Sequence, residues 1–280
     1  MSRIMKDLPR GTSVIDTTSG PTNIHVMGKG PMIIVVHGGP GFDHRYMVSA
    51  LEFLQDHRTL IFYDQPGCGD TPVEETGATI PSLGHHLAAL AEQLVEKNNF
   101  GLICHSWGSL IAAAACHELQ QKGLGKIREG ILINPTPLNR GGYEICRSNL
   151  LSRVPPETLV KAEKMVGSGV DGDGIMDMML PYYYHQKPSS PLPTFPFRLN
   201  TYLAVNAALD DFDYSDNLAC FQKMSVVHGE SDFTTLELID ELIESTESLL
   251  TMPECGHFPF FEEKELFQKL VLQCLNVGVA

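Results

Sequence analysis

Hydrophobic residues in this chain gather in short continuous runs, separated by stretches of mixed polarity. Residues 32–36 read MIIVV, and residues 59–63 read TLIFY. A short apolar run without polar interruption is typical of a strand that is buried on both faces of a sheet. Residues 12–27 instead predict two short strands separated by the turn Ser19-Gly20-Pro21. Further strands are expected at 101–104, 131–133, 224–227 and 248–252.

Between these runs the hydrophobic residues follow a helical period. In residues 83–95 one face carries Leu87, Leu90, Ala91 and Leu94. In residues 262–275 one face carries Leu266, Phe267, Leu270, Val271 and Cys274. Helices are also expected at 108–121 and 236–243. Because strands and helices alternate from residue 32 to residue 133, the pattern predicts an α/β fold, with a parallel sheet covered by helices on both faces.

The regular alternation stops between residues 139 and 216. This segment contains Pro155-Pro156, a Gly/Asp-rich stretch at 167–174 and four prolines between residues 188 and 196. A long irregular insert in a compact domain is usually functional or disordered. Since the alternation resumes at residue 224, we predict one core domain, 1–138 and 217–280, interrupted by a cap at 139–216, rather than two consecutive domains.

Composition narrows the class of protein. The chain has 280 residues, of which 43% are hydrophobic and 19% charged, as in an ordinary soluble globular protein. The net charge of −14 opposes binding to nucleic acid or to an anionic membrane. No apolar run is long enough to span a bilayer, and residues 1–11 lack the apolar core of a signal peptide. Seven cysteines without paired spacing predict neither a disulfide framework nor a zinc site, so we expect a reducing, cytoplasmic location.

Ser106 stands where the predicted strand 101–104 gives way to the predicted helix 108–121. A sharp turn of this kind, the nucleophile elbow, exposes a hydroxyl above a parallel sheet. The strained turn needs small residues two positions before and after the serine. Gly108 meets this need, whereas Cys104 stands where the usual pattern has glycine. The alternative is a serine that caps an ordinary helix.

A glycine-rich turn, His37-Gly38-Gly39-Pro40-Gly41, directly follows the predicted strand 32–36. Glycines let a backbone approach a bound group closely. The N–H groups of Gly39 and Trp107 together could stabilise the oxyanion that develops during acyl transfer. Pro40 has no N–H to contribute. The alternative is a plain Gly/Pro turn between a strand and a helix.

Candidates for the acid and the base follow the last two predicted strands. Asp232 lies just beyond one of them, where a carboxylate can orient a histidine, and Glu230 is its nearest competitor. His257 lies in the loop before the last helix. Of the other histidines, His105 would point elsewhere on the turn and His228 lies on a strand. Only His257 completes the chain order of serine, acid and histidine.

Three motifs resemble those of a known family: HGGPG at 37–41, DQPGCG at 64–69 and SWGS at 106–109. Over residues 20–276 the chain resembles the α/β-hydrolase superfamily and, within it, the proline iminopeptidase family, where it is similar to the tricorn-interacting aminopeptidase. The resemblance implies an α/β-hydrolase fold with a cap, no metal or cofactor, and release of an N-terminal residue from short peptides. It assigns a triad and two oxyanion donors: Ser106, Asp232, His257, Gly39 and Trp107.

Residues that would bind the substrate are less regular. Family members place glutamates against the free amine of the peptide, since a buried anion pairs with an ammonium. Asp210 falls at what looks like one such position, and Phe233 falls where the second glutamate stands. Tyr184 belongs to an aromatic run of the cap, which could line a pocket or form the core of the cap. We therefore expect substrate contacts at Asp210, Phe233 and Tyr184.

The sequence leaves three functions open. The first is a serine aminopeptidase that acts on small peptides or amino-acid amides through an acyl-enzyme. The second keeps the triad but cleaves an ester, a lactone or a non-peptide amide. The third is a hydrolase-fold protein that binds a ligand without turnover. In each case the expected partner is a small molecule or a short peptide, and the oligomeric state cannot be predicted.

Overall fold

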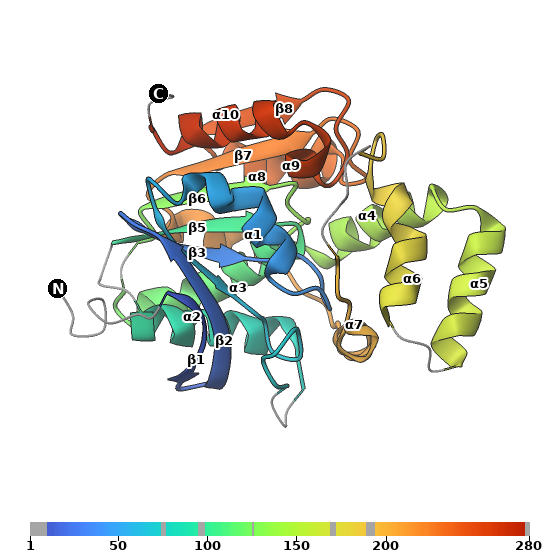
Figure 1. Cartoon of the computed structure of the whole chain (residues 1–280), viewed down its shortest axis with the longest axis horizontal. Helices are drawn as coiled ribbons and strands as arrows, with labels where there is room; N and C mark the ends of the chain where they lie inside the picture. Colours follow the sequence, from blue (N-terminus) through green and yellow to red (C-terminus); the bar gives the residue numbers. More distant parts are fainter. Residues whose placement is uncertain are drawn as a thin grey trace.

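An eight-stranded sheet forms the centre of the molecule (Figure 1). The computed structural model describes residues 10–73, 77–94, 99–124, 126–168, 172–188 and 194–277. The strands lie in the order β1-β2-β4-β3-β5-β6-β7-β8, with β2 antiparallel to β1 and β4 and all other neighbours parallel. Their bounds are β1 Gly11–Thr17, β2 Gly20–Gly28, β3 Met32–Val36, β4 Thr59–Tyr63, β5 Phe100–His105, β6 Glu129–Ile133, β7 Met224–Gly229 and β8 Ser248–Met252. The predicted α/β class is confirmed.

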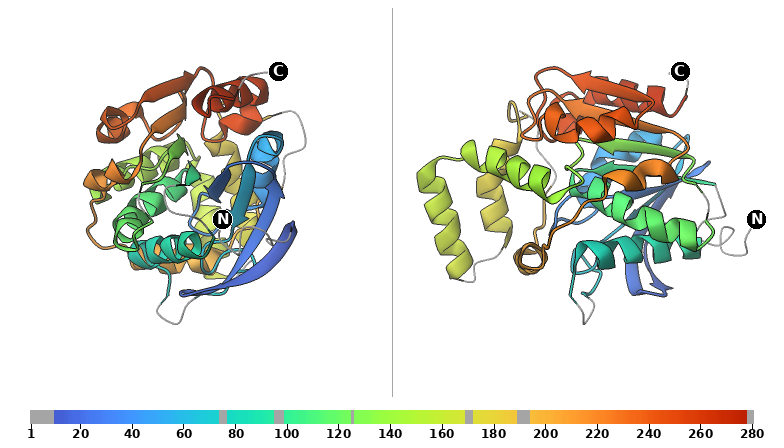
Figure 2. Two further views of the ribbon diagram at one scale, coloured as in Figure 1. Left: turned by 90° about the vertical axis from the view of Figure 1, so that its left-hand side faces the viewer. Right: turned by 180° about the vertical axis from the view of Figure 1, so that it is seen from behind.

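Helices cover both faces of this sheet, as Figure 2 shows. Alternate residues of β3 supply the two faces: Ile34 belongs to the core beneath α2 and α3, whereas Ile33 and Val35 belong to the core beneath α1 and α10. This alternation explains why the strand is apolar throughout. The helices of the core are α1 Arg45–Leu51, η1 Glu52–Leu54, α2 Ile80–Leu94, α3 Trp107–Gln121, η3 Ser215–Cys220, η4 Leu236–Ile239, α8 Asp240–Glu244, α9 Pro259–Glu262 and α10 Lys264–Cys274.

The segment between β6 and β7 is helical rather than irregular. It contains α4 Arg140–Ser152, α5 Pro156–Gly167, α6 Gly172–Met179, η2 Leu180–Tyr183 and α7 Leu199–Ala207, to one side of the sheet in Figure 1. The prolines at 155 and 156 mark the start of α5, because proline is well suited to the first turn of a helix. The side chain of Asn139 caps α4 by accepting a hydrogen bond from Gly142 N at 2.8 Å. The domain boundaries at 138/139 and 216/217 stay a prediction.

Two cysteines are joined, contrary to the expectation from their spacing. A disulfide links Cys116 of α3 to Cys220 of η3, with Cα atoms 5.6 Å apart and 104 positions between them in the sequence. The pair forms because η3 packs against α3, which no local spacing indicates. A disulfide between these residues does not favour the reducing location that the cysteine spacing predicted. No helix in the described ranges is long and apolar enough to cross a membrane.

Candidate active site

Ser106 occupies a strained turn between β5 and α3. Its backbone has φ 52° and ψ −124°, a conformation that few residues other than glycine adopt. The turn depends on Gly108, because a Cβ there would lie 2.4 Å from the carbonyl oxygen of Val36. Cys104 is fully buried in the core beneath α3, so the sheet accommodates its side chain where glycine was expected. The local geometry of a nucleophile elbow is therefore present.

Loops after three different strands bring Ser106, His257 and Asp232 together. His257 Nε2 lies 2.8 Å from Ser106 Oγ, and His257 Nδ1 lies 2.9 Å and 3.0 Å from the two carboxylate oxygens of Asp232. Since an ionised carboxylate can only accept, Nδ1 carries the proton and Nε2 is left to accept from the serine hydroxyl. Glu230 is exposed and has no part in this chain of hydrogen bonds. This is the geometry in which a nucleophile, a base and an orienting acid are arranged in acyl-transfer sites.

The carboxylate of Asp232 is held in its ionised form. The residue is only 4% exposed, and burial alone would raise its pKa. The charge and hydrogen bonds of His257, together with His228 and Asn134, hold the pKa of Asp232 below its ordinary value. Thr234 N also donates to this carboxylate, at 3.3 Å. Asp232 therefore remains an anion at neutral pH.

Asn134 is a residue of the site that sequence reasoning missed. Its amide nitrogen donates to Asp232 Oδ2 and, at 3.0 Å, to the carbonyl oxygen of Gly256. Its backbone has φ 44°, which asparagine tolerates better than most residues. A signal was present in the sequence, because Asn134 follows β6 directly and precedes Pro135. A polar side chain at the carboxyl end of a parallel strand lies at the edge where ligands bind.

Gly39 and Trp107 lie beside each other at the mouth of the elbow. Gly39 has φ 149°, and a Cβ there would approach Gly41 N to 2.9 Å and Trp107 Cδ1 to 4.0 Å. No acceptor in the described part of the chain takes the Gly39 N–H. Trp107 is the first residue of α3, so its N–H has no acceptor within the helix. Gly38 N donates instead to the hydroxyl of Tyr46, at 2.6 Å.

His105 and Tyr46 connect the glycine turn to His257. Burial lowers the pKa of His105 to about 3, so its ring is neutral. Its Nε2 donates to the carbonyl oxygen of His257 at 2.9 Å, and its Nδ1 accepts from the Tyr46 hydroxyl at 2.8 Å. Gly38 has no room for a side chain, because a Cβ would lie 2.9 Å from both His105 Nδ1 and Tyr46 Oη. His105 therefore holds the backbone in place and is not available as a base.

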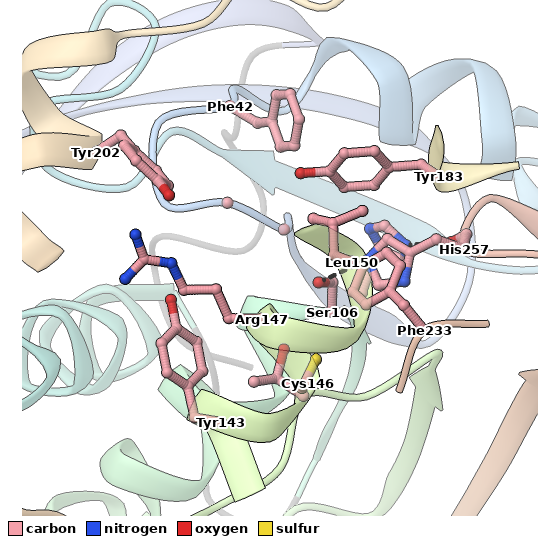
Figure 3. A pocket seen from close by; sticks show the side chains of 14 residues that line it. Phe42, Ser106, Tyr143, Cys146, Arg147, Leu150, Tyr183, Tyr202, Phe233 and His257 are labelled. Carbon is pink, nitrogen blue, oxygen red and sulfur yellow. Dashed lines mark hydrogen bonds between the residues drawn. The ribbon is translucent and has the colours of Figure 1, made fainter. Parts of the chain in front are cut away.

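The hydroxyl of Ser106 opens into a pocket between the sheet and the helices of residues 139–216 (Figure 3). The empty space of this pocket amounts to roughly 590 Å³, including the part open to solvent. Fourteen residues line it: Gly38, Gly39, Phe42, His105, Ser106, Thr136, Tyr143, Cys146, Arg147, Leu150, Tyr183, Tyr202, Phe233 and His257. Among the described residues, no group of three His, Cys, Asp or Glu is arranged to hold a metal ion.

Of the three residues expected to contact substrate, the structure brings only Phe233 into this pocket. Asp210 is exposed in the segment after α7 and does not line the pocket. Tyr184 is 5% exposed, with its ring 5.4 Å from that of Phe258, and it too is absent from the lining. Neighbouring side chains at the end of η2 point in different directions, so Tyr183 takes the place expected for Tyr184. The structure therefore places Asp210 and Tyr184 outside the lining of this pocket, and their contact with a substrate stays a prediction.

Comparison with known proteins agrees with this fold. The pattern that describes the alpha/beta hydrolase family matches residues 33–269, and the chain belongs to that family. The proline iminopeptidase of Thermoplasma volcanium is 24% identical over 273 residues, covering 88% of this chain and 89% of that one. The similarity to proline iminopeptidases that three motifs indicated is thereby confirmed.

Similar solved structures include a proline iminopeptidase and an esterase. The proline iminopeptidase of Mycobacterium smegmatis superposes with a TM-score of 0.67 at 20% identity, covering 95% of this chain and 98% of that one. A thermophilic esterase from Thermogutta terrifontis superposes with a TM-score of 0.64 at 21% identity and the same coverage. At these identities the likeness concerns the fold, and the reaction has to be argued from the site.

Proposed function

We propose that the protein is a serine hydrolase that cleaves carboxylic esters or amides through an acyl-enzyme on Ser106. The observation that carries this proposal is the continuous chain of hydrogen bonds from Ser106 Oγ through His257 to Asp232, at the base of an open pocket. His257 takes the serine proton as Oγ attacks the carbonyl carbon, and it then gives that proton to the leaving group. A water molecule then attacks the acyl-enzyme with the same help from His257, and this step releases the carboxylic acid and restores Ser106.

Two backbone N–H groups would stabilise the oxyanion of the tetrahedral intermediate. Gly39 and Trp107 lie beside each other at the elbow, and the first N–H groups of α3 point out of the helix end. Donors oriented before the reaction cost no reorganisation as charge develops, and each contributes about 100- to 1,000-fold to the rate. Gly39 and Trp107 are therefore the proposed oxyanion donors.

A proline iminopeptidase-type aminopeptidase is the second candidate, favoured by the full-length similarity to such enzymes. That reaction requires a site for the ammonium group of the peptide, which a carboxylate would provide. The described residues that line the pocket include no Asp or Glu, and Phe233 and Arg147 contribute apolar surface and positive charge instead. The lining of the pocket therefore favours a substrate that is an ester, or an amide that carries no free amine.

A substrate panel on the wild type and on Ser106→Ala tests the proposal. Short 4-nitrophenyl esters should be hydrolysed, a fluorophosphonate probe should label Ser106, and Ser106→Ala should lose at least about 10,000-fold in kcat/KM. Proline and alanine arylamides, free and N-acetylated, separate the two candidates. A strong preference for the free amine would establish the aminopeptidase, and an unlabelled Ser106 without turnover would indicate a binding protein.

A further inference from the structure

One face of α4 forms a wall of the pocket. The four residues that line it, Tyr143, Cys146, Arg147 and Leu150, follow the spacing i, i+3, i+4 and i+7. Residues with this spacing share one side of a helix. Arg147 therefore faces the same space as the Ser106 hydroxyl, as Figure 3 shows.

Arg147 has no carboxylate partner in the part of the chain that the structure describes. Glu144 lies one turn before it on α4 but pairs with Arg140, at 2.8 Å. The carboxylate of Asp232 is buried and bound to His257 and Asn134. In a chain with 34 acidic and 20 basic residues, an arginine left without an anion in a pocket is a candidate for binding one from solution.

Three tyrosine hydroxyls add donors to this part of the pocket. Tyr143, Tyr183 and Tyr202 line it, and no hydrogen bond to another described residue engages their hydroxyl groups. Figure 3 shows the hydroxyls of Tyr143 and Tyr202 directed toward Arg147. Burial raises the pKa values of Tyr143 and Tyr183, so both phenols stay protonated and can donate.

We propose that Arg147, assisted by the hydroxyls of Tyr143 and Tyr202, binds a carboxylate of the substrate, separate from the bond that is cleaved. This inference rests on the proposed hydrolysis at Ser106 and names its substrate class: esters or amides that carry a second, anionic group. A guanidinium offers two parallel N–H donors that match the two oxygens of a carboxylate. The single positive charge of one guanidinium matches the single negative charge of one carboxylate.

Two matched pairs of esters test the proposal and locate the carboxylate. The first pair, 4-nitrophenyl hydrogen glutarate and its methyl ester, carries the group on the acyl side. The second, 4-butyryloxybenzoate and its methyl ester, carries it on the leaving group. In at least one pair, kcat/KM of the wild type should favour the free carboxylate by about 10- to 100-fold, the usual effect of a hydrogen-bonded charge.

Two variants of α4 assign the effect to one side chain. In Arg147→Gln, the ratio of kcat/KM for the free carboxylate to kcat/KM for its methyl ester should fall close to one. Arg147→Lys should keep part of this preference, since lysine retains the positive charge but lacks the two parallel N–H donors of the guanidinium. Lys161→Gln, on the exposed surface of α5 and outside the pocket, should leave kcat/KM for both esters of each pair unchanged. Wild-type ratios of one or less, or an unchanged ratio in Arg147→Gln, would overturn the proposal while leaving the hydrolase assignment intact. No hydrolysis of any ester would overturn both.

Discussion

The phenyl ring of Phe233 lies against the imidazole of His257, with ring centroids 4.3 Å apart and the planes inclined by 31°. Tyr183 meets the same imidazole edge-on at 5.7 Å, and Arg153 lies 5.8 Å from the centre of the Phe233 ring. Phe233 directly follows Asp232 in the chain. Two consecutive residues therefore hold His257, one through its Nδ1 and the other through its face.

Phe233→Leu is expected to lower kcat/KM on a neutral 4-nitrophenyl ester by about 3- to 10-fold, the usual value of an aromatic pair. The smaller side chain leaves the imidazole free to depart from Ser106. Steady-state kinetics on the variant measure the effect. Phe53→Leu is the control, because Phe53 contacts Phe267, away from the pocket. Equal activity of Phe233→Leu and wild type would show that the ring contact does not position His257.

Tyr46→Phe should lower the free energy of unfolding by about 1–3 kcal/mol and reduce kcat. The change leaves two buried groups, Gly38 N–H and His105 Nδ1, without a partner. Tyr63→Phe is a matched control, since the Tyr63 hydroxyl is buried without a hydrogen-bond partner among the described residues. Urea denaturation and kinetics of both variants provide the measurement. If the free energy of unfolding fell as much in Tyr63→Phe as in Tyr46→Phe, the role given to the Tyr46 hydroxyl would be contradicted.

Asn134→Asp should reduce kcat/KM by about 10-fold or more, since it replaces a donor to Asp232 by a second negative charge. The same charge should raise the pKa of Asp232 and narrow the pH range of activity on the acid side. Asn134→Gly keeps a residue suited to positive φ and removes only the amide, so its loss should be smaller. The measurement is a pH–rate profile of kcat/KM for each variant. Wild-type activity in Asn134→Asp would show that the hydrogen bond from Asn134 to Asp232 is not needed for catalysis.

Buried histidines should make the protein less stable as the pH falls from 6.5 toward 4. Burial lowers the pKa of His86 to about 4 and that of His105 to about 3. The folded state keeps both rings neutral in this range, whereas the unfolded state, with pKa values near 6.5, takes up protons. The free energy of unfolding should therefore fall by about 1.4 kcal/mol per pH unit for each histidine that is protonated in the unfolded state and neutral in the folded state.

His86→Gln provides the control for this dependence. The variant should show a slope shallower by about one proton between pH 4.5 and 6, measured by urea denaturation at a series of pH values. His86 lies on α2, away from the residues that line the pocket. The rate of ester hydrolysis by the variant at pH 7.5 therefore serves as a check that its active site is intact. An identical slope in variant and wild type would show that His86 titrates normally in the folded protein.

Much of the fold could be predicted because its information is local. The apolar runs at β3 and β4 predict strands buried on both faces. A turn separates β1 from β2 as expected, but it lies at residues 18–19 rather than 19–21, and Gly20 and Pro21 belong to β2. The helices between residues 140 and 207 cannot be read from the local pattern, because Pro156, Gly167 and Gly172 lie at helix ends and resemble breaks in regular structure. Helix α1 was also missed, since its seven residues are too few to show a clear period.

Local patterns of residues are sufficient to predict the alternation of strands and helices, and the chain order of Ser106, Asp232 and His257. Each depends on periods and spacings of a few residues, or on the fixed order of loops at one edge of a parallel sheet. The surroundings of these elements follow from the folded chain alone: the Tyr46–His105 link, the amide of Asn134, the pairing of Cys116 with Cys220 and the direction of Arg147. These contacts join residues far apart in the chain, and their geometry follows from packing that no local pattern encodes.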